Sequence, residues 1–351
     1  LGEDTTGSSF AGQYRSELNV SADAVLEAYR DVLASKYSLP AITYRLTRGF
    51  RDEDVAMCVG CLAMVDAVAG GVTYSRNPVD VHDHRIFTNA AWGLPKAVVD
   101  GSAACDIFIV SREDAMTVVA EDIRSKERKF VCYPEEGICR LDVTGAERQL
   151  PSITHDQAID LARMAVALER HYDVAQDIEW AIDSRSALYL LQCRPLQQKP
   201  VETAPQQAEP AGDGHSVIYR GGITASSGAA SGPVFIADKG SDVLAFPDGA
   251  VLVVRQALPR WASLLSRAAA VVTEEGGFAG HLANVAREFG VPALFAVPHA
   301  TRTLRTGELA TVDATGQAIH SGRIEALIHQ APPRKSLMQG SPVYEILSEA
   351  S

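Results

Sequence analysis

The sequence predicts a mixed fold of the α/β (α+β) class, arranged as two bodies joined by a linker. Residues 177–195 alternate apolar and polar side chains around a short polar turn, which is typical of a β-hairpin. Residues 281–289 follow closely spaced glycines and repeat apolar side chains at helical spacing. Residues 196–214 are rich in Pro, Gln and Ala and lack a core's large apolar side chains. We therefore expect a body over 1–195, a linker over 196–214, a second body over 215–327 and an irregular tail over 328–351.

Composition and charge narrow the class of protein. The chain has 351 residues, of which 46% are hydrophobic, and its formal net charge is −12. This length and this apolar fraction suit two or three globular domains. The acidic balance disfavours nucleic acid or an anionic membrane as a partner, and no apolar run approaches the ~20 residues that span a bilayer. The six cysteines form no disulfide-like framework, which favours a reducing cytoplasm.

Two helices and a buried strand are expected before the hairpin. Residues 21–37 and 154–172 repeat apolar side chains at intervals of three and four, so each segment predicts an amphipathic helix. Residues 56–65 form an apolar run, which predicts a strand. Cys58 and Cys61 lie in that run without a second cysteine pair or clustered histidines, so we expect them to be core residues rather than zinc ligands.

The predicted hairpin brings polar side chains face to face. A four-residue turn over 184–187 places Glu179 opposite Gln192 and Asp177 opposite Arg194. Carboxylate and amide oxygens suit Mg²⁺ together with nucleotide phosphates, and a guanidinium is able to clamp a phosphate. A surface hairpin with cross-strand polar pairs explains the same spacing equally well, so spacing alone leaves both interpretations open.

His281 is predicted to lie in the first turn of a helix. Apolar side chains at i, i+3, i+4 and i+7 from Leu282 form one face, and Gly290 ends the helix. A helix N-terminus favours phosphate, and a neutral imidazole there is able to attack a phosphorus atom. For an isolated histidine, a buried or capping role would be the simpler interpretation. We also expect Glu274 or Glu275 to lie near this histidine.

The residues around His281 favour the chemical interpretation. The segment Thr273–Pro292 closely resembles the phosphohistidine motif of the phosphoenolpyruvate-utilising enzymes, the family of phosphoenolpyruvate synthase and pyruvate phosphate dikinase. Ordered matches to the same family lie over 228–234, 249–254 and 304–316. The resemblance implies that 215–327 form a swivelling β/β/α domain that carries the phosphoryl group on His281.

The hairpin resembles the same family. Asp177-Ile-Glu-Trp-Ala181, a short gap and Leu191-Gln-Cys-Arg-Pro195 are similar to the closing signature of its ATP-grasp nucleotide-binding domain. The resemblance implies a partial ATP-grasp domain over 1–195, in which Glu179 and Gln192 hold Mg²⁺ and Arg194 contacts a phosphate of ATP. It also implies that the first part of that domain lies upstream of Leu1.

The resemblance implies an ATP-dependent phosphotransferase. In the resembled dikinases the histidine attacks the β-phosphate of ATP, and AMP is the nucleotide product. The acceptor in phosphoenolpyruvate synthase is pyruvate, bound by a C-terminal barrel domain that this chain does not contain. We therefore expect the acceptor site to lie on a further segment or a partner protein, and this chain alone to be poorly active.

Two alternatives stay open at this stage. Rifampin-type antibiotic phosphotransferases and phenol-phosphorylating synthases share both modules but use other acceptors. A non-catalytic nucleotide-binding protein is the second alternative, because Leu62, Lys96 and Ala279 depart from the residues usual in the family. The retention of His281 together with the three polar residues of the hairpin favours an enzyme.

Overall fold

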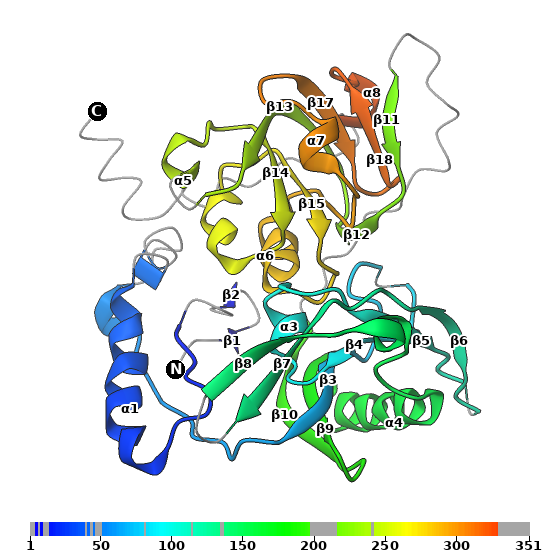
Figure 1. Cartoon of the computed structure of the whole chain (residues 1–351). Helices are drawn as coiled ribbons and strands as arrows, with labels where there is room; N and C mark the ends of the chain where they lie inside the picture. The colour runs from blue at the N-terminus through cyan, green and yellow to red at the C-terminus, as the bar shows by residue number, and fades with distance from the viewer. Residues whose placement is uncertain are drawn as a thin grey trace. The chain divides into compact units, whose positions relative to one another are not determined.

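A computed structural model gives the chain a mixed α/β architecture (Figure 1). It describes residues 4–5, 8–9, 14–38, 41–42, 45, 51–80, 82–113, 115–133, 137–196, 216–239 and 242–328. The expected linker beyond Leu196 and the expected tail beyond Ile328 lie outside these residues. The chain divides into two compact units, one of Val65–Val131 and Cys139–Ala331, the other of Leu1–Met64, Cys132–Ile138 and Pro332–Ser351.

A six-stranded sheet fills the first half of the larger unit. Its strand order is β10-β9-β3-β4-β5-β6, and every neighbouring pair is antiparallel. The strands are β3 (Ala67–Tyr74), β4 (Ile86–Trp92), β5 (Asp106–Val110), β6 (Val118–Asp122), β9 (Gln176–Asp183) and β10 (Leu188–Pro195). Figure 1 shows α4 (His155–Tyr172) lying along this sheet. The helix expected over 154–172 is therefore confirmed.

The six-stranded sheet is covered differently on its two faces. Ile178, Trp180 and Ile182 share a buried apolar cluster with residues of α4. Because side chains alternate along a strand, Asp177 and Glu179 point to the opposite face. That alternation is the one expected from the sequence.

An eight-stranded sheet fills the second half of the larger unit. Its order is β11-β18-β17-β13-β14-β15-β16-β12, and the pairs from β13 to β16 are parallel. The strands are β11 (Val217–Arg220), β12 (Ile223–Ser226), β13 (Ala229–Ala237), β14 (Val251–Gln256), β15 (Ala270–Glu275), β16 (Ala293–Phe295), β17 (Leu309–Asp313) and β18 (Ala318–Ser321). The helices beside them are α5 (Asp242–Ala245), α6 (His281–Phe289), α7 (Ala300–Thr303) and α8 (Glu325–Ile328).

The apolar face predicted for α6 packs into the core of the eight-stranded sheet. Leu282, Val285 and Ala286 are buried in one cluster with β14 and β15 residues, and Phe289 packs against it. Gly290 caps the helix in a left-handed conformation with φ of 65°, which glycine adopts without a Cβ penalty. Both the start of this helix at His281 and its end at Gly290 match the sequence prediction.

Shorter elements complete the described chain. These are β1 (Asp4–Thr5), β2 (Ser8–Ser9), α1 (Val25–Ala34), α3 (Lys96–Val99), β7 (Arg128–Tyr133), β8 (Gly137–Asp142) and 3₁₀ turns at Ala22–Ala24, Ser35–Tyr37, Asp52–Asp54, Gly145–Gln149 and Pro259–Leu264. The helix expected over 21–37 is confirmed as α1 with its flanking turns, yet none of its residues is buried. No helix in the described part of the chain is long and apolar enough to cross a membrane.

The strand predicted over 56–65 is wrong. These residues form neither helix nor strand, and Cys58 and Cys61 are exposed rather than in a core. The strand beside β9 begins only at Ala67. An apolar run becomes a strand only where a neighbouring strand offers hydrogen bonds, so composition alone placed this element too early.

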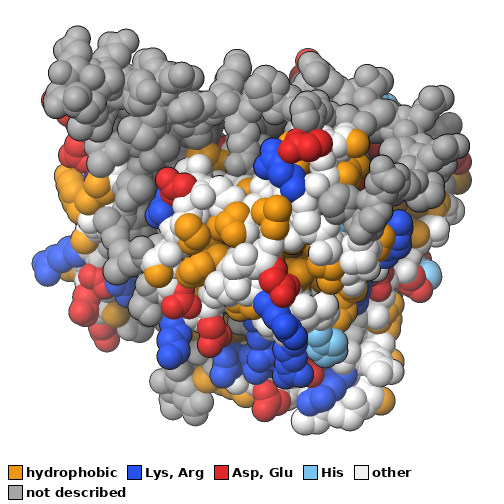
Figure 2. All heavy atoms as spheres, turned by 90° about the horizontal axis from the view of Figure 1, so that it is seen from above, with side chains coloured by type: hydrophobic (Ala, Val, Ile, Leu, Met, Phe, Trp, Pro, Cys, Tyr) orange, Lys and Arg blue, Asp and Glu red, His pale blue; other side chains and the backbone are white. Residues whose placement is uncertain are grey.

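Charge is unevenly distributed over the surface. The net charge of the chain is −12, yet Figure 2 shows lysine and arginine side chains gathered next to an apolar area on one face. An acidic chain therefore still has local basic areas, where an anion can be held.

Candidate functional site

The hairpin of β9 and β10 has the predicted register where its polar residues lie. Gln192 pairs with Glu179, and Arg194 pairs with Asp177, as the sequence predicts. Nearer the turn the register differs by one residue, because Leu188 pairs with Ile182. A shift between Leu190 and Gln192 absorbs the difference, as a β-bulge does.

Arg194 and Asp177 form a buried ion pair. Nε and Nη2 of Arg194 donate to Oδ2 of Asp177 at 3.0 and 2.9 Å. The side chains are only 16% and 6% exposed. The negative charge of Asp177 raises the pKa of Arg194, so the guanidinium stays charged. Oδ1 of Asp177 is buried and has no hydrogen-bond partner among the described residues.

Glu179 lies on the same face of the sheet. Burial and the nearby charge of Asp177 raise the pKa of Glu179 to about 7, although Arg194 opposes the shift. A bound cation would favour the ionised form of a carboxyl group whose pKa is raised in this way. Glu179, the free oxygen of Asp177 and the exposed amide of Gln192 are oxygen ligands of the kind that Mg²⁺ takes, so these residues fit the metal. The described residues contain no cluster of three or more His, Cys, Asp or Glu side chains that could hold a metal.

His281 is the first residue of α6. Gly280 is the N-cap and contributes no side-chain hydrogen bond, so the first N–H groups of the helix keep their partial positive charge. The imidazole is 5% exposed, and no hydrogen bond ties it to another described residue. Burial and then the charge of Arg194 lower the pKa of His281 to about 4. The ring is therefore neutral at pH 7, and a ring nitrogen keeps its lone pair.

An aromatic contact seats the loop before α6 on the carboxylate face of the six-stranded sheet. Asp177 and Glu179 pair with Tyr74 and Val72 of β3, so all four side chains share that face. The ring of Phe278 lies 5.9 Å from that of Tyr74 and 5.8 Å, edge to face, from that of Phe87. Phe278 and Ala279 are buried in one cluster with Val72 and Tyr74. The structure thus brings the loop of His281 to the face that carries Glu179 and Arg194.

Arg287 holds the same loop from inside α6. Its Nη1 donates to the carbonyl oxygens of Phe278 and Ala225, both at 2.9 Å, and its Nη2 donates to Asn284. The side chain is 8% exposed, and its guanidinium lies over the ring of Tyr74, 6.0 Å from its centroid. Sequence reasoning missed both Arg287 and Phe278. An arginine six residues after His281 on a helix with a buried face was the available signal.

Neither expected acidic neighbour bonds to His281. Glu274 accepts hydrogen bonds from the backbone N–H and the hydroxyl of Thr301. Glu275 accepts from Gln256 and Arg255. Both carboxylates are thus engaged within the eight-stranded sheet and its helices, so nothing in the structure assigns them to the imidazole.

Comparisons with known proteins match both halves of the chain. A family model described as “Pyruvate phosphate dikinase, AMP/ATP-binding domain” matches residues 1–214, and one described as “PEP-utilising enzyme, mobile domain” matches residues 246–317. The phosphoenolpyruvate synthase of Pyrococcus furiosus is 33% identical over 342 residues, which are 95% of this chain and 42% of that protein. That of Escherichia coli is 33% identical over 328 residues, which are 88% of this chain and 40% of that protein.

The matched relatives are longer than this chain, which spans about two fifths of their length. Among solved structures, the solution structure of an Enzyme I protein covers 30% of this chain at a TM-score of 0.22 and 19% identity. That similarity is too low to support an inference.

Proposed function

Because the chain belongs to the family of phosphoenolpyruvate synthase and pyruvate phosphate dikinase, we propose that it accepts a phosphoryl group from ATP on His281 and passes it to an acceptor bound elsewhere. The observation that carries the proposal is the position of His281. It is a buried, neutral imidazole at a helix N-terminus, close enough to Arg194 for that charge to lower its pKa. A structural histidine in a core would be expected to hydrogen-bond, whereas this ring bonds to no described residue.

The sheet residues bind and orient the nucleotide. Arg194 contacts a phosphate, while Asp177 holds the guanidinium in place through two hydrogen bonds to one oxygen. Glu179 and Gln192 would hold Mg²⁺, and that ion would offset the negative charge of the phosphates. Because the pKa of Glu179 is raised to about 7, a metal bound there would displace the proton from carboxyl groups that still carry one.

His281 is the nucleophile. The lone pair of a ring nitrogen forms a bond to phosphorus while the bridging P–O bond breaks, and the leaving nucleotide takes the bonding electrons. If the β-phosphate is attacked, as in the resembled dikinases, AMP leaves and His281 first carries the β- and γ-phosphates together. Water then cleaves the bond between these two phosphates, inorganic phosphate leaves with the γ-phosphorus, and the β-phosphoryl group stays on the ring nitrogen. The N–H groups at the start of α6 then face the new phosphoryl group and hold its oxygens. His281 is 5% exposed, and this burial limits the access of water to the ring before transfer.

The second half of the reaction needs a separate site. The halves of this chain correspond in this proposal to a partial ATP-grasp domain over 1–195 and a swivelling domain over 215–327, with 196–214 as the segment between them. Pyruvate is the proposed acceptor, since the relatives are phosphoenolpyruvate synthases, and an acceptor of another kind is the alternative. A cytoplasmic location stays a prediction.

Labelling with ATP that carries ³²P at the β or the γ position tests the proposal. We expect acid-labile, base-stable label from β-labelled ATP in the wild-type chain, or in a longer chain extended at its N-terminus. His281→Ala is expected to remove all label. His155→Ala is the matched control, because this exposed histidine begins α4, which packs on the other face of the six-stranded sheet, and its ring contacts Glu121 of β6.

Two results would count against the proposal. Label that persists in His281→Ala would place the phosphoryl group on another residue. No label on either the short or the extended chain would favour the non-catalytic, nucleotide-binding alternative.

A further inference from the structure

A cavity at one edge of the six-stranded sheet is rich in basic side chains. Arg76 follows β3, Arg112 follows β5, and His84 and Arg85 lie just before β4. Because β3 and β5 both run antiparallel to β4, the ends of β3 and β5 lie beside the start of β4, at one end of the sheet. All four side chains line the cavity, whose volume is about 780 Å³.

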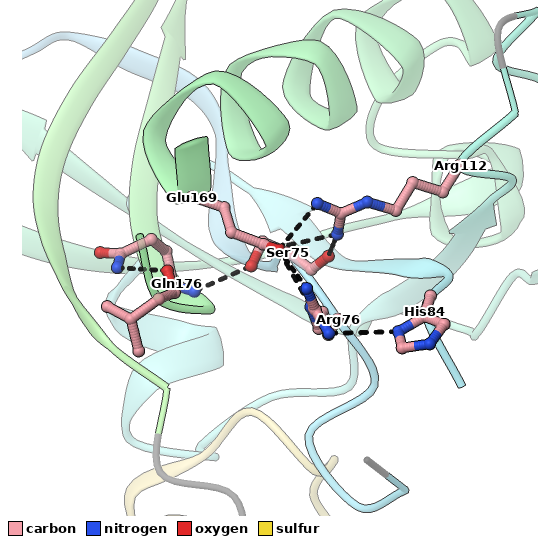
Figure 3. Close-up of polar contacts among 7 residues, drawn as sticks. Ser75, Arg76, His84, Arg112, Glu169 and Gln176 are labelled. Carbon is pink, nitrogen blue, oxygen red and sulfur yellow. Dashed lines mark hydrogen bonds and ion pairs between the residues drawn. The ribbon is translucent and has the colours of Figure 1, made fainter. Parts of the chain in front are cut away.

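Glu169 of α4 orders two of these arginines (Figure 3). Its Oε1 accepts from Nε and Nη2 of Arg76, at 2.9 and 2.7 Å, and from Nη2 of Arg112 at 2.8 Å. Its Oε2 accepts from Nη1 of Arg112 at 2.9 Å. The Glu169 side chain is 8% exposed. One carboxylate is therefore shared by two guanidiniums, which leaves the three side chains together with one net positive charge. Glu169 is buried, whereas the Arg76 and Arg112 side chains are 36% and 23% exposed.

Both guanidiniums keep unused donors. Each has five N–H groups, and within the described contacts Arg76 uses three of them and Arg112 uses three. His84 adds another donor. A guanidinium only donates, so Nδ1 of His84 accepts from Arg76 at 3.2 Å, and the ring hydrogen lies on Nε2. The donors are already oriented, so a ligand would lose little side-chain entropy on binding.

The remaining charges of the cavity do not cancel this excess. Arg85 is paired with Asp83, which lies beside it, so together they are neutral. Glu113 lines the cavity but is an exposed side chain, so water and salt screen its charge from the two arginines. The part of the cavity lined by Arg76 and Arg112 thus carries positive charge and hydrogen-bond donors.

We propose that this cavity binds a small molecule through a phosphate group, held by Arg76, Arg112 and His84. A tetrahedral phosphate offers more oxygen acceptors than a carboxylate does, and it matches the forked donors of two arginines. The site is distinct from the proposed nucleotide site. Glu169 belongs to the helix that covers Ile178 and Trp180, whereas Glu179 points to the other face.

A short chain of hydrogen bonds connects the cavity to the nucleotide side. Nη1 of Arg112 donates to the carbonyl oxygen of Ser75 at 2.7 Å. Ser75 and Gln176 are joined by two further bonds, from N of Ser75 to O of Gln176 at 3.0 Å and from N of Gln176 to Oγ of Ser75 at 2.8 Å (Figure 3). Gln176 directly precedes Asp177, the partner of Arg194. A ligand that shifts Arg112 would therefore act on the backbone that positions the ion pair.

Calorimetric titration of inorganic phosphate into the whole chain, at constant ionic strength and without nucleotide, tests the site. We expect saturable binding that Arg112→Gln weakens at least tenfold. Arg255→Gln is the matched control, because this arginine is exposed and paired with Glu275 on the other sheet. Arg194→Lys separates the two sites, since it removes the proposed nucleotide clamp but keeps its charge, and we expect it to weaken phosphate binding far less than Arg112→Gln does.

Three results would overturn the proposal. These are no saturable binding at millimolar phosphate, equal binding by wild type and Arg112→Gln, or a loss of binding in Arg194→Lys alone. If Arg112→Gln misfolds, His84→Ala is the second variant, because it removes a donor and leaves the bonds of Glu169 in place. An unchanged phosphate affinity of His84→Ala would also contradict the proposed site. Since no ATP is present, failure here leaves the phosphorylation of His281 untouched.

Discussion

The β9–β10 hairpin and the loop before α6 place their polar groups in opposite ways. On the hairpin, charges are paired or crowded, since Arg194 bonds Asp177 and the pKa of Glu179 is raised to about 7 by burial and by its acidic neighbour. Directly after the loop, at the start of α6, His281 is buried, neutral at pH 7 and hydrogen-bonded to no described side chain. The difference teaches that the sheet pairs and crowds charged groups, whereas burial, helped by the charge of Arg194, keeps the imidazole of His281 neutral.

Removing the guanidinium of Arg194 from the hairpin is expected to have the largest effect on stability. Arg194→Gln leaves Asp177 buried without its partner, and breaking a buried ion pair in this way costs about 3 kcal/mol of unfolding free energy. Urea denaturation measures the loss, and His281 labelling should also vanish. Arg185→Gln on the same hairpin is the matched control, because Arg185 is 81% exposed and its loss should leave the urea midpoint unchanged. Equal urea midpoints for wild type, Arg194→Gln and Arg185→Gln would show that the Arg194 ion pair does not stabilise the fold.

Cross-linking tests whether packing seats the loop. A Cβ at Gly277 would lie 3.4 Å from Sγ of Cys105, which is close to disulfide geometry. Gly277→Cys is therefore expected to form a disulfide with Cys105 under mild oxidation, detected as a mobility shift or by mass spectrometry. Adding Phe278→Ala should slow the cross-link at least tenfold, because both aromatic contacts disappear. Gly277→Cys with Cys105→Ala is the control, and a failure to cross-link in the first variant would refute the seated loop.

The pH dependence of labelling tests whether the imidazole of His281 is neutral. With a pKa of about 4, His281 stays neutral from pH 8 to pH 5.5, so its phosphorylation rate at saturating Mg²⁺ should be flat over this range. An imidazole with the ordinary pKa of about 6.5 would be mostly protonated at pH 5.5 and lose about tenfold in rate. Initial rates of ³²P incorporation across this range decide between the two, and a tenfold fall would contradict the buried, neutral ring.

A smaller effect is expected at Glu179. Its raised pKa of about 7 means that Mg²⁺ competes with a proton. The ionised fraction falls from about one half at pH 7 to about one tenth at pH 6, so the apparent Mg²⁺ affinity of the nucleotide complex should drop about fivefold. Glu179→Gln cannot titrate and should show weak affinity with no such slope. Titration of Mg²⁺ at pH 7 and at pH 6 measures the apparent affinity of wild type and of Glu179→Gln. An equal loss of affinity in the two proteins between these pH values would show that Glu179 does not bind the metal.

Local pattern was sufficient to predict several parts of this protein. The alternation of Asp177, Glu179 and their apolar neighbours predicts which face each side chain takes, because a strand has a period of two. The pairs Glu179 with Gln192 and Arg194 with Asp177 are predicted from a four-residue turn, and the structure has both because a register shift beyond Leu190 offsets a one-residue difference nearer the turn. Helical spacing and Gly290 likewise predict where α6 begins and ends. These features depend on residues close in sequence.

Contacts between distant segments were decided only by the tertiary structure. Phe278 meets Tyr74 and Phe87 across about two hundred residues, and no local pattern carries that information. The same holds for Glu169, whose bridge from Arg76 to Arg112 joins a helix to the ends of two strands. The apolar run over 56–65 failed as a strand for the converse reason, since burial depends on a partner that the run itself does not specify. Sequence by itself determined the chemistry that the chain carries, and packing decided which of those groups meet, because burial and ion pairing depend on neighbours in space.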